Sequence, residues 1–370
     1  MEWQLIESDQ DLARVITEAG PVDSVMVDTE FMRRNTFFPQ VALVQLSFGG
    51  TAWLIDPLLI SDPGPLAKLL TDPSVIKVLH SVSEDLEVFQ RWLGVMPAPL
   101  FDTQRAAAML DMGFGLGYGA LVNTVCEVEL EKGETRSDWL QRPLREAQCH
   151  YAAQDVTYLH TVYQELARRC REHHKFDWVL ADGEDAVAGL ASKDHGYFKR
   201  IKSAWKLNSR QLARLMAVCE WREETARSRD KPRSWIIDDS ACLQLAQFAP
   251  ETLADLQSQG ELPSAVVRRY GETLLNIVGQ QSELPEDSLP ARLPEPMSAT
   301  QRNRVKLLKK KVEQIAKTLT TVPQILMAAK DYEALLREAE GVDIELPRHW
   351  QGWRKTLVVT PLREYLADVS

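Results

Sequence analysis

The segments with β-strand character are confined to the first half of this chain, and no other feature restricts its fold as strongly. The runs "SVMVDTEF", "VALVQLSF", "TAWLIDP" and "VIKVLHS" are rich in β-branched and apolar residues. Gly49-Gly50 separates the second run from the third, which predicts a tight hairpin between antiparallel neighbours. Helical patterns, among them "PGPLAKLLTDP" and residues 145–173, accompany these runs. We therefore expect an α/β domain with a mixed sheet.

After about Lys202 the strand signals vanish and helical patterns replace them. "SRQLARLMAVCEWREETARS" places Leu212, Leu215 and Val218 on one helical face. The stretch "SELPEDSLPARLPEPMS" carries four prolines and little periodicity, which is typical of a linker. A second helical block follows it. Both blocks open with a basic helix and contain "ELP", so we interpret them as two diverged copies of one small helical domain.

The expected architecture is therefore a multidomain α/β plus all-α protein. We place the α/β domain at residues 1–202, the first helical domain at 203–284, the linker at 285–296 and the second helical domain at 297–370. A chain of 370 residues is long enough for two or three domains.

The composition, 45% hydrophobic and 26% charged, is typical of a soluble globular protein. No apolar run has the length of a membrane span, and the acidic start "MEWQLIESDQ" does not resemble a signal peptide. The five cysteines are scattered without a C-x-x-C motif, which favours a reducing cytoplasm and argues against a cysteine zinc site.

The net charge of −10 argues weakly against a nucleic-acid partner, but the charge is unevenly distributed. Residues 197–235 hold eleven Lys/Arg and four Asp/Glu, and residues 300–317 hold seven and one. The basic helix "QRNRVKLLKKKVEQIAKTL" has two open interpretations, a solvated helix face or a surface for an RNA backbone.

Two acids follow the buried strand in "VMVDTEF". Asp28 and Glu30 are two residues apart and point to the same face of a strand. Two carboxylates at roughly 4 Å repel by about 4 kcal/mol at an effective dielectric of 20. A solvated strand end is the commoner explanation for such a pair taken alone.

A third acid, Asp85, lies in the first turn of the helix predicted from "SVSEDLEVFQRWLG". Ser81 and Glu84 have the spacing of a capping box, and Gly94 marks the end of the helix. An acid in the first turn is also favoured by the helix dipole, so Asp85 alone indicates no function.

Tyr151 and Asp155, in "HYAAQDVTYL", are four residues apart on one helical face. By themselves they are equally consistent with a half-buried tyrosine that is hydrogen-bonded to a carboxylate. Taken together, however, three separate segments deliver four carboxylates with no matching Lys or Arg. Such oxygen-only sets suit Mg²⁺ or Mn²⁺, and two such ions can act on a phosphodiester.

The segments "VDTEF", "HSVSEDLEVF" and "YAAQDVTYL" resemble the three motifs of the DEDD 3′–5′ exonuclease superfamily, which has a ribonuclease H-like fold. Tyr151, four residues before Asp155, matches the DEDDy subgroup. "SDWLQRPL" and the two helical blocks are similar to the ribonuclease D family, whose helical modules are HRDC domains.

The resemblance implies a role for each matching residue. Asp28 would bridge two divalent metal ions, Mg²⁺ or Mn²⁺. Glu30 and Asp155 would hold the ion that bears the attacking water, and Asp85 would hold the second ion. Tyr151 would orient the water. No RNA-binding residues are assigned.

The resemblance also implies the reaction, which is the release of nucleoside 5′-monophosphates from RNAs with trailing 3′ nucleotides, chiefly tRNA precursors. We expect RNA as the partner, no membrane association, a monomer and a cytoplasmic location. Two alternatives stay open: a DNA exonuclease of the same chemistry, and an RNA-binding adaptor without activity.

Three further signals concern the neighbourhood of the site and the core. His80 either lines the site or is satisfied by neighbouring groups. The glycines of "GFGLGYG" do not fit a nucleotide-binding pattern and are expected to form a loop beside the site. The tryptophans of "RHWQGWRK" are expected in the core.

Overall fold

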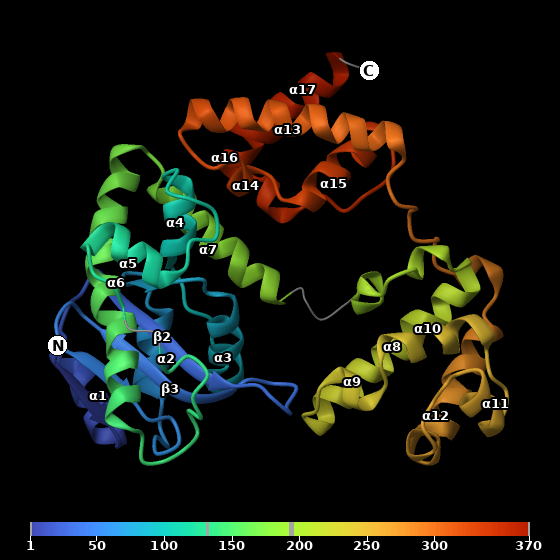
Figure 1. Cartoon of the computed structure of the whole chain (residues 1–370), viewed down its shortest axis with the longest axis horizontal. Coiled ribbons are helices and arrows are strands. Elements are labelled where there is room, and N and C mark those ends of the chain that lie inside the picture. Colours follow the sequence, from blue (N-terminus) through green and yellow to red (C-terminus); the bar gives the residue numbers. More distant parts are fainter. Residues whose placement is uncertain (1, 131–132, 192–195, 369–370) are drawn as a thin grey trace. The chain divides into compact units, whose positions relative to one another are not determined.

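The computed structural model describes residues 2–130, 133–191 and 196–368 (Figure 1). The chain divides into two compact units. The first comprises Met1–Met32, Gln40–Leu190 and Met297–Ser370, and the second comprises Arg33–Pro39 and Ala191–Pro296. Among the described residues, no helix is both long enough and apolar enough to cross a membrane.

A six-stranded mixed sheet forms the centre of the first unit, in the order β1-β4-β3-β2-β5-β6. Its strands are β1 Trp3–Ile6, β2 Ser24–Met32, β3 Gln40–Ser47, β4 Ala52–Ile55, β5 Ile76–Leu79 and β6 Leu100–Asp102. β3 and β4 are antiparallel, as the glycine pair predicted, and β2 pairs antiparallel with β3 and parallel with β5. The mixed α/β sheet expected from the sequence is confirmed.

Helices cover both faces of this sheet. They are α1 Asp9–Glu18, α2 Gly64–Thr71, α3 Ser83–Leu93, α4 Thr103–Met109, α5 Tyr118–Cys126, α6 Glu146–Glu172 and α7 Phe176–Ala191. The 27-residue helix α6 packs across five strands of the sheet. Met26 joins the apolar core on the α6 side, whereas Val25 and Val27 join a second core that includes residues of α1, α2 and α3. The strand alternation of β2 therefore separates the two faces.

Two local expectations were wrong. The acids do not end their strand, because β2 continues to Met32 with a register shift between Glu30 and Phe31. The predicted Ser81 capping box is also absent: α3 begins after Val82 without a side-chain cap, and Ser81 has φ 65°. Asp102 instead satisfies a backbone donor near the start of the helix, since its carboxylate accepts a hydrogen bond from the Ser81 backbone N–H at 3.0 Å.

The second helical block packs into the first unit. It contains α13 Ala299–Leu319, α14 Pro323–Leu326, α15 Ala329–Ala339, α16 Gly352–Arg354, the π-helical turn Lys355–Val359 and α17 Thr360–Asp368. The Val322 N–H donates to the Ala108 carbonyl of α4 at 3.2 Å. Trp353 stacks on Trp178 of α7, with centroids 4.3 Å apart and planes within 6°. Trp350 is buried, so its expected core role is confirmed, whereas Trp353 is half-buried and packs against the same core.

The second unit is helical. Its helices are α8 Ser209–Arg229, α9 Arg233–Ile236, α10 Asp239–Phe248, α11 Leu253–Ser258 and α12 Ser264–Ser282. α8 and α13 both end at a residue in the left-handed conformation, Asp230 and Thr320, and a four-residue helix follows each. This shared order of elements agrees with two diverged copies of one helical domain.

Candidate active site

Three carboxylates converge on the face of β2 that α6 covers. Asp28 and Glu30 extend from the strand, and Asp155 reaches them from α6. One carboxylate oxygen of each lies within 4.8 Å of the other two. Because α6 crosses the sheet, residues more than a hundred positions apart in the sequence meet at one point.

Asp85 lies outside this group of three. A residue on the opposite face of β2 fixes the orientation of its side chain. Thr29 stands between Asp28 and Glu30 and therefore points away from them, towards α3. Its hydroxyl donates to a carboxylate oxygen of Asp85 at 2.5 Å, and both residues are buried. One strand thus positions two carboxylates directly and a third through a hydrogen bond.

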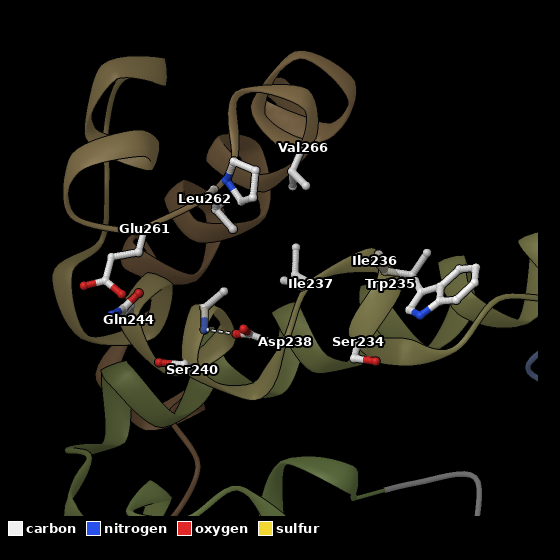
Figure 2. Close-up of a pocket in the computed structure, with 12 residues that line it drawn as sticks. Ser234, Trp235, Ile236, Ile237, Asp238, Ser240, Gln244, Glu261, Leu262 and Val266 are labelled. Carbon is white, nitrogen blue, oxygen red and sulfur yellow. Dashed lines mark hydrogen bonds between the residues drawn. The ribbon is translucent and has the colours of Figure 1, made fainter. Parts of the chain in front are cut away.

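A cavity of about 170 Å³ opens over the carboxylates. Its lining residues are Asp28, Glu30, His80, Tyr118, Tyr151, Asp155 and Leu159. A larger cavity of about 280 Å³ lies in the second unit, between the α9–α10 segment and the residues before α12 (Figure 2). Ile237, Leu262 and Val266 give that cavity an apolar wall. The ionisable cluster therefore lies in the smaller cavity.

Both interpretations of His80 are correct. The side chain lines the cavity, and its two ring nitrogens lie 3.0 Å from Thr103 Oγ1 and 3.1 Å from the Leu116 carbonyl. Tyr118, at the end of the glycine-rich segment, also lines the cavity, and its hydroxyl donates to the Gln154 carbonyl at 3.0 Å. The expected position of this loop beside the site is therefore confirmed.

Tyr151 reaches the cavity from the same helix as Asp155. The partner of its hydroxyl among the described residues is Thr135, whose Oγ1 lies 3.5 Å away, rather than Asp155. Its ring lies 6.0 Å from that of Trp139, in the segment "SDWLQRPL". The hydroxyl is thus held at the cavity without a bond to the carboxylates. Burial, followed by the charge of Asp155, raises the pKa of Tyr151, so the hydroxyl keeps its proton.

Burial and mutual repulsion both disfavour the charged form of the acids. Burial, with the charges of Asp155, Asp85 and Glu30, raises the pKa of Asp28 well above its usual value. Burial followed by Asp155 and Asp85 raises the pKa of Glu30 to about 9. Burial raises the pKa of Asp85 and of Asp155 to about 7. Without a counter-cation the cluster therefore retains protons near neutral pH.

This donor set fits a divalent cation. All of the clustered donors are carboxylate oxygens, which hard ions such as Mg²⁺ and Mn²⁺ prefer. A cation would also replace the protons that burial and repulsion otherwise retain.

The sequence reasoning missed two residues of the site, Thr29 and Tyr118. Strand alternation contained the signal for Thr29, since a residue between two acids must face the other side of the sheet. The signal for Tyr118 was weaker. The residue stands at the end of the glycine-rich loop, and that loop was expected to lie beside the site.

The chain is similar in sequence to known families and proteins. A family model described as a 3′–5′ exonuclease matches residues 3–171, and a model of the HRDC domain matches residues 211–278. Ribonuclease D from Pseudomonas paraeruginosa is 42% identical, with 96% of this chain and 95% of that protein covered. Ribonuclease D from Escherichia coli is 34% identical, with 100% and 99% covered.

A solved structure extends the similarity to the whole fold. The crystal structure of Escherichia coli RNase D, described as "an exoribonuclease involved in structured RNA processing", superposes with a TM-score of 0.92 at 33% identity. The superposition covers 100% of this chain and 99% of that one.

Proposed function

Because this chain belongs to the ribonuclease D family and is a 3′–5′ exoribonuclease, we propose that it trims trailing 3′ nucleotides from RNA, chiefly from tRNA precursors. The proposed products are nucleoside 5′-monophosphates, released one at a time. The observation that carries the proposal is the convergence of Asp28, Glu30 and Asp155 within 4.8 Å in a cavity that Tyr151 also lines. A cavity of about 170 Å³ is far too small for a folded RNA, so only the end of a strand could reach the carboxylates.

Two divalent ions complete the proposed site. When bound, they would supply charge neutralisation at the scissile phosphate and a water of lowered pKa. Asp28 would contact both ions, Glu30 and Asp155 would hold one, and Asp85 would hold the other. The raised pKa values of these acids support the assignment, because a carboxylate that resists ionisation in the bare protein gains most from a cation.

The chain's own residues position the reactants. Tyr151 would hold the attacking water through a hydroxyl that stays protonated and is not engaged by a carboxylate. Thr29 would fix the rotamer of Asp85 through its 2.5 Å hydrogen bond. These contacts prearrange the site before the RNA enters, which lowers the entropic cost of reaching the transition state.

We propose the functional division stated above, with catalysis in residues 1–202 and helical domains at 203–284 and 297–370 joined by 285–296. The enzyme would act as a monomer. A cytoplasmic location is supported by the bacterial origin of the relatives named above.

The test uses a tRNA that carries a short 3′ extension, with Mg²⁺ or Mn²⁺, and resolves products by length over time. We expect single-nucleotide shortening from the 3′ end, release of 5′-monophosphates and arrest near the mature end. The matching DNA oligomer is the control, since the 2′-hydroxyl distinguishes the two substrates. Equal rates on DNA would favour a DNA exonuclease, and RNA binding without any product would favour an adaptor.

A further inference from the structure

The segment that leads into α8, together with the first half of that helix, combines strong positive charge with an absence of acids. Residues 196–219 contain six Lys/Arg and no Asp/Glu, in a protein whose net charge is −10. Part of this segment, residues 196–210, lies outside both ranges that the family models match. Neither the exonuclease model nor the HRDC model therefore accounts for it.

The local fold directs these charges outward. Two 3₁₀ turns, Tyr197–Arg200 and Ala204–Lys206, precede α8. Ile201, Ala204 and Leu207 are buried in the core of the second unit. These buried residues anchor the segment to that core, whereas the cations of the segment are exposed. The exposed cations, which we call the basic turn patch, are Lys199, Arg200, Lys202 and Lys206.

No ion pair neutralises the basic turn patch among the residues that the structure describes. The nearby Arg210 differs, because its guanidinium donates to the carbonyls of Ser282 and Leu284 at the end of α12. Some exposed arginines elsewhere are paired with acids: Arg14 with Asp11 and Glu18, for example. The patch is thus four positive charges within eight residues that have no carboxylate partner in the described part of the chain. Lys199, Arg200 and Lys206 lie 5.5 to 5.9 Å from the ring centroids of neighbouring aromatic residues.

A solvated surface is the ordinary explanation of scattered lysines, but it does not account for this concentration. Like charges close together raise the free energy of the folded protein, and a polyanion would relieve that repulsion. RNA is the polyanion that the family acts on. The catalytic cavity is acidic and contributes little attraction for a distant phosphate. The binding of a whole RNA therefore requires cations elsewhere.

We propose that the basic turn patch is a binding surface for the RNA sugar–phosphate backbone, separate from the carboxylate site. The inference rests on the proposed function, because it assigns a surface to the body of the same substrate. Its side chains bind phosphates as point charges or, for Arg200, as a planar donor. Binding there depends on charge and not on base sequence.

The experiment measures the binding of one full-length tRNA to the full-length protein in EDTA, across a series of salt concentrations. One variant changes the four patch residues to Gln. The control changes three lysines and one arginine that are exposed and scattered to Gln, and removes the same charge: Lys68, Lys330, Lys355 and Arg14. Melting temperatures verify that both variants are folded. Hydrolysis of a short RNA oligomer with Mg²⁺ is measured in parallel.

Each phosphate neutralised contributes about 0.7 to 0.9 to the salt slope, so loss of all four contacts in the patch variant should remove about 3 to 3.5 units of slope. We expect its tRNA affinity at low salt to fall by about tenfold or more, with hydrolysis of the short oligomer unchanged and the control near wild type. Equal salt slopes in the wild type and the patch variant, or an equal loss of tRNA affinity in the patch variant and the control variant, would overturn the inference. Failure of the wild-type protein to hydrolyse any RNA would contradict the proposed function instead, since binding in EDTA is measured independently.

Discussion

At the scale of single residues, Tyr151 has the contacts expected of a group that positions a reactant. Its hydroxyl lines the cavity and has only a 3.5 Å contact with Thr135 among the described residues. We predict that Tyr151→Phe lowers kcat by about 10²-fold or more, with little change in RNA affinity. Single-turnover kinetics and binding in EDTA measure the two effects separately. A nearly unchanged kcat would mean that the ring is only packed against Trp139.

The raised pKa values of the acids predict how stability depends on pH when metal is removed. The folded-state pKa values of Glu30, Asp85 and Asp155 are about 9, 7 and 7, above those of an unfolded chain. The folded state therefore holds more protons, and its stability must decrease as the pH rises from about 4 to about 9.

We expect the melting temperature in EDTA to fall over this interval, and Mg²⁺ or Mn²⁺ to restore it most strongly at the alkaline end. The variant Asp155→Asn removes one of these titrations and should flatten the curve. A melting temperature in EDTA that rises with pH across this range would contradict the assignment of buried, repelling acids.

At the scale of elements, the close approach of α7 to β6 depends on a missing side chain. A Cβ at Gly183 would clash with the carbonyl oxygen of Leu100 and lie 3.0 Å from its Cβ. We predict that Gly183→Ala destabilises the protein by about 1 to 3 kcal/mol. The control is Gly189→Ala on the same helix, where a Cβ meets nothing within 4 Å. That change should be neutral or stabilise by up to about 1 kcal/mol. Equal melting temperatures for the two variants would refute the close packing.

Elements also show where sequence reasoning succeeded and where it failed. The β3–β4 hairpin and the long helix α6 were predictable, because a glycine pair and a sustained apolar periodicity are local signals. The start of α3 was not, since the backbone N–H groups of Ser81 and Val82, directly before the helix, donate to Asp102, some twenty residues later in the sequence. Tertiary contacts of this kind leave no local signal.

The site also combines features that local sequence signals predicted with a tertiary contact that they did not. Strand and helix periodicities placed Asp28 beside Glu30, and Tyr151 one turn before Asp155. The hydrogen bond from Thr29 to Asp85 joins segments 56 residues apart, and only the folded chain reveals it.

At the scale of the whole molecule, the second helical block shares a core with the first unit. Asp182 of α7 forms ion pairs with Arg105 of α4 and with Arg354 of α16, both at 2.6 Å, and Asp182 and Arg354 are buried. The Lys175 ammonium donates to the carbonyls of Met109 and Thr320. The composition of the linker, residues 285–296, indicated that the second helical block is a separate module. Composition does not indicate which surface such a block packs against.

We therefore predict that Trp353→Ala, which removes the stacking on Trp178, lowers the free energy of unfolding by about 3 kcal/mol and reduces activity on heating. The matched control is Trp235→Ala, because that residue is 60% exposed, and its effect should stay within about 0.5 kcal/mol. Thermal unfolding of both variants gives the comparison. If Trp353→Ala melts like wild type, the second helical block does not stabilise the first unit through this stack.

We propose that the carboxylate cluster performs the hydrolysis of RNA. The decisive experiment measures release of the 3′-terminal nucleotide in a single turnover with Mg²⁺ for wild type, Asp28→Asn and the exposed-acid control Asp343→Asn. We predict 5′-monophosphate release by wild type and by Asp343→Asn, and near-complete loss in Asp28→Asn with unchanged folding, because a missing ligand costs several kcal/mol of transition-state stabilisation. Strong release by folded Asp28→Asn, or by wild type in EDTA, would contradict the claim.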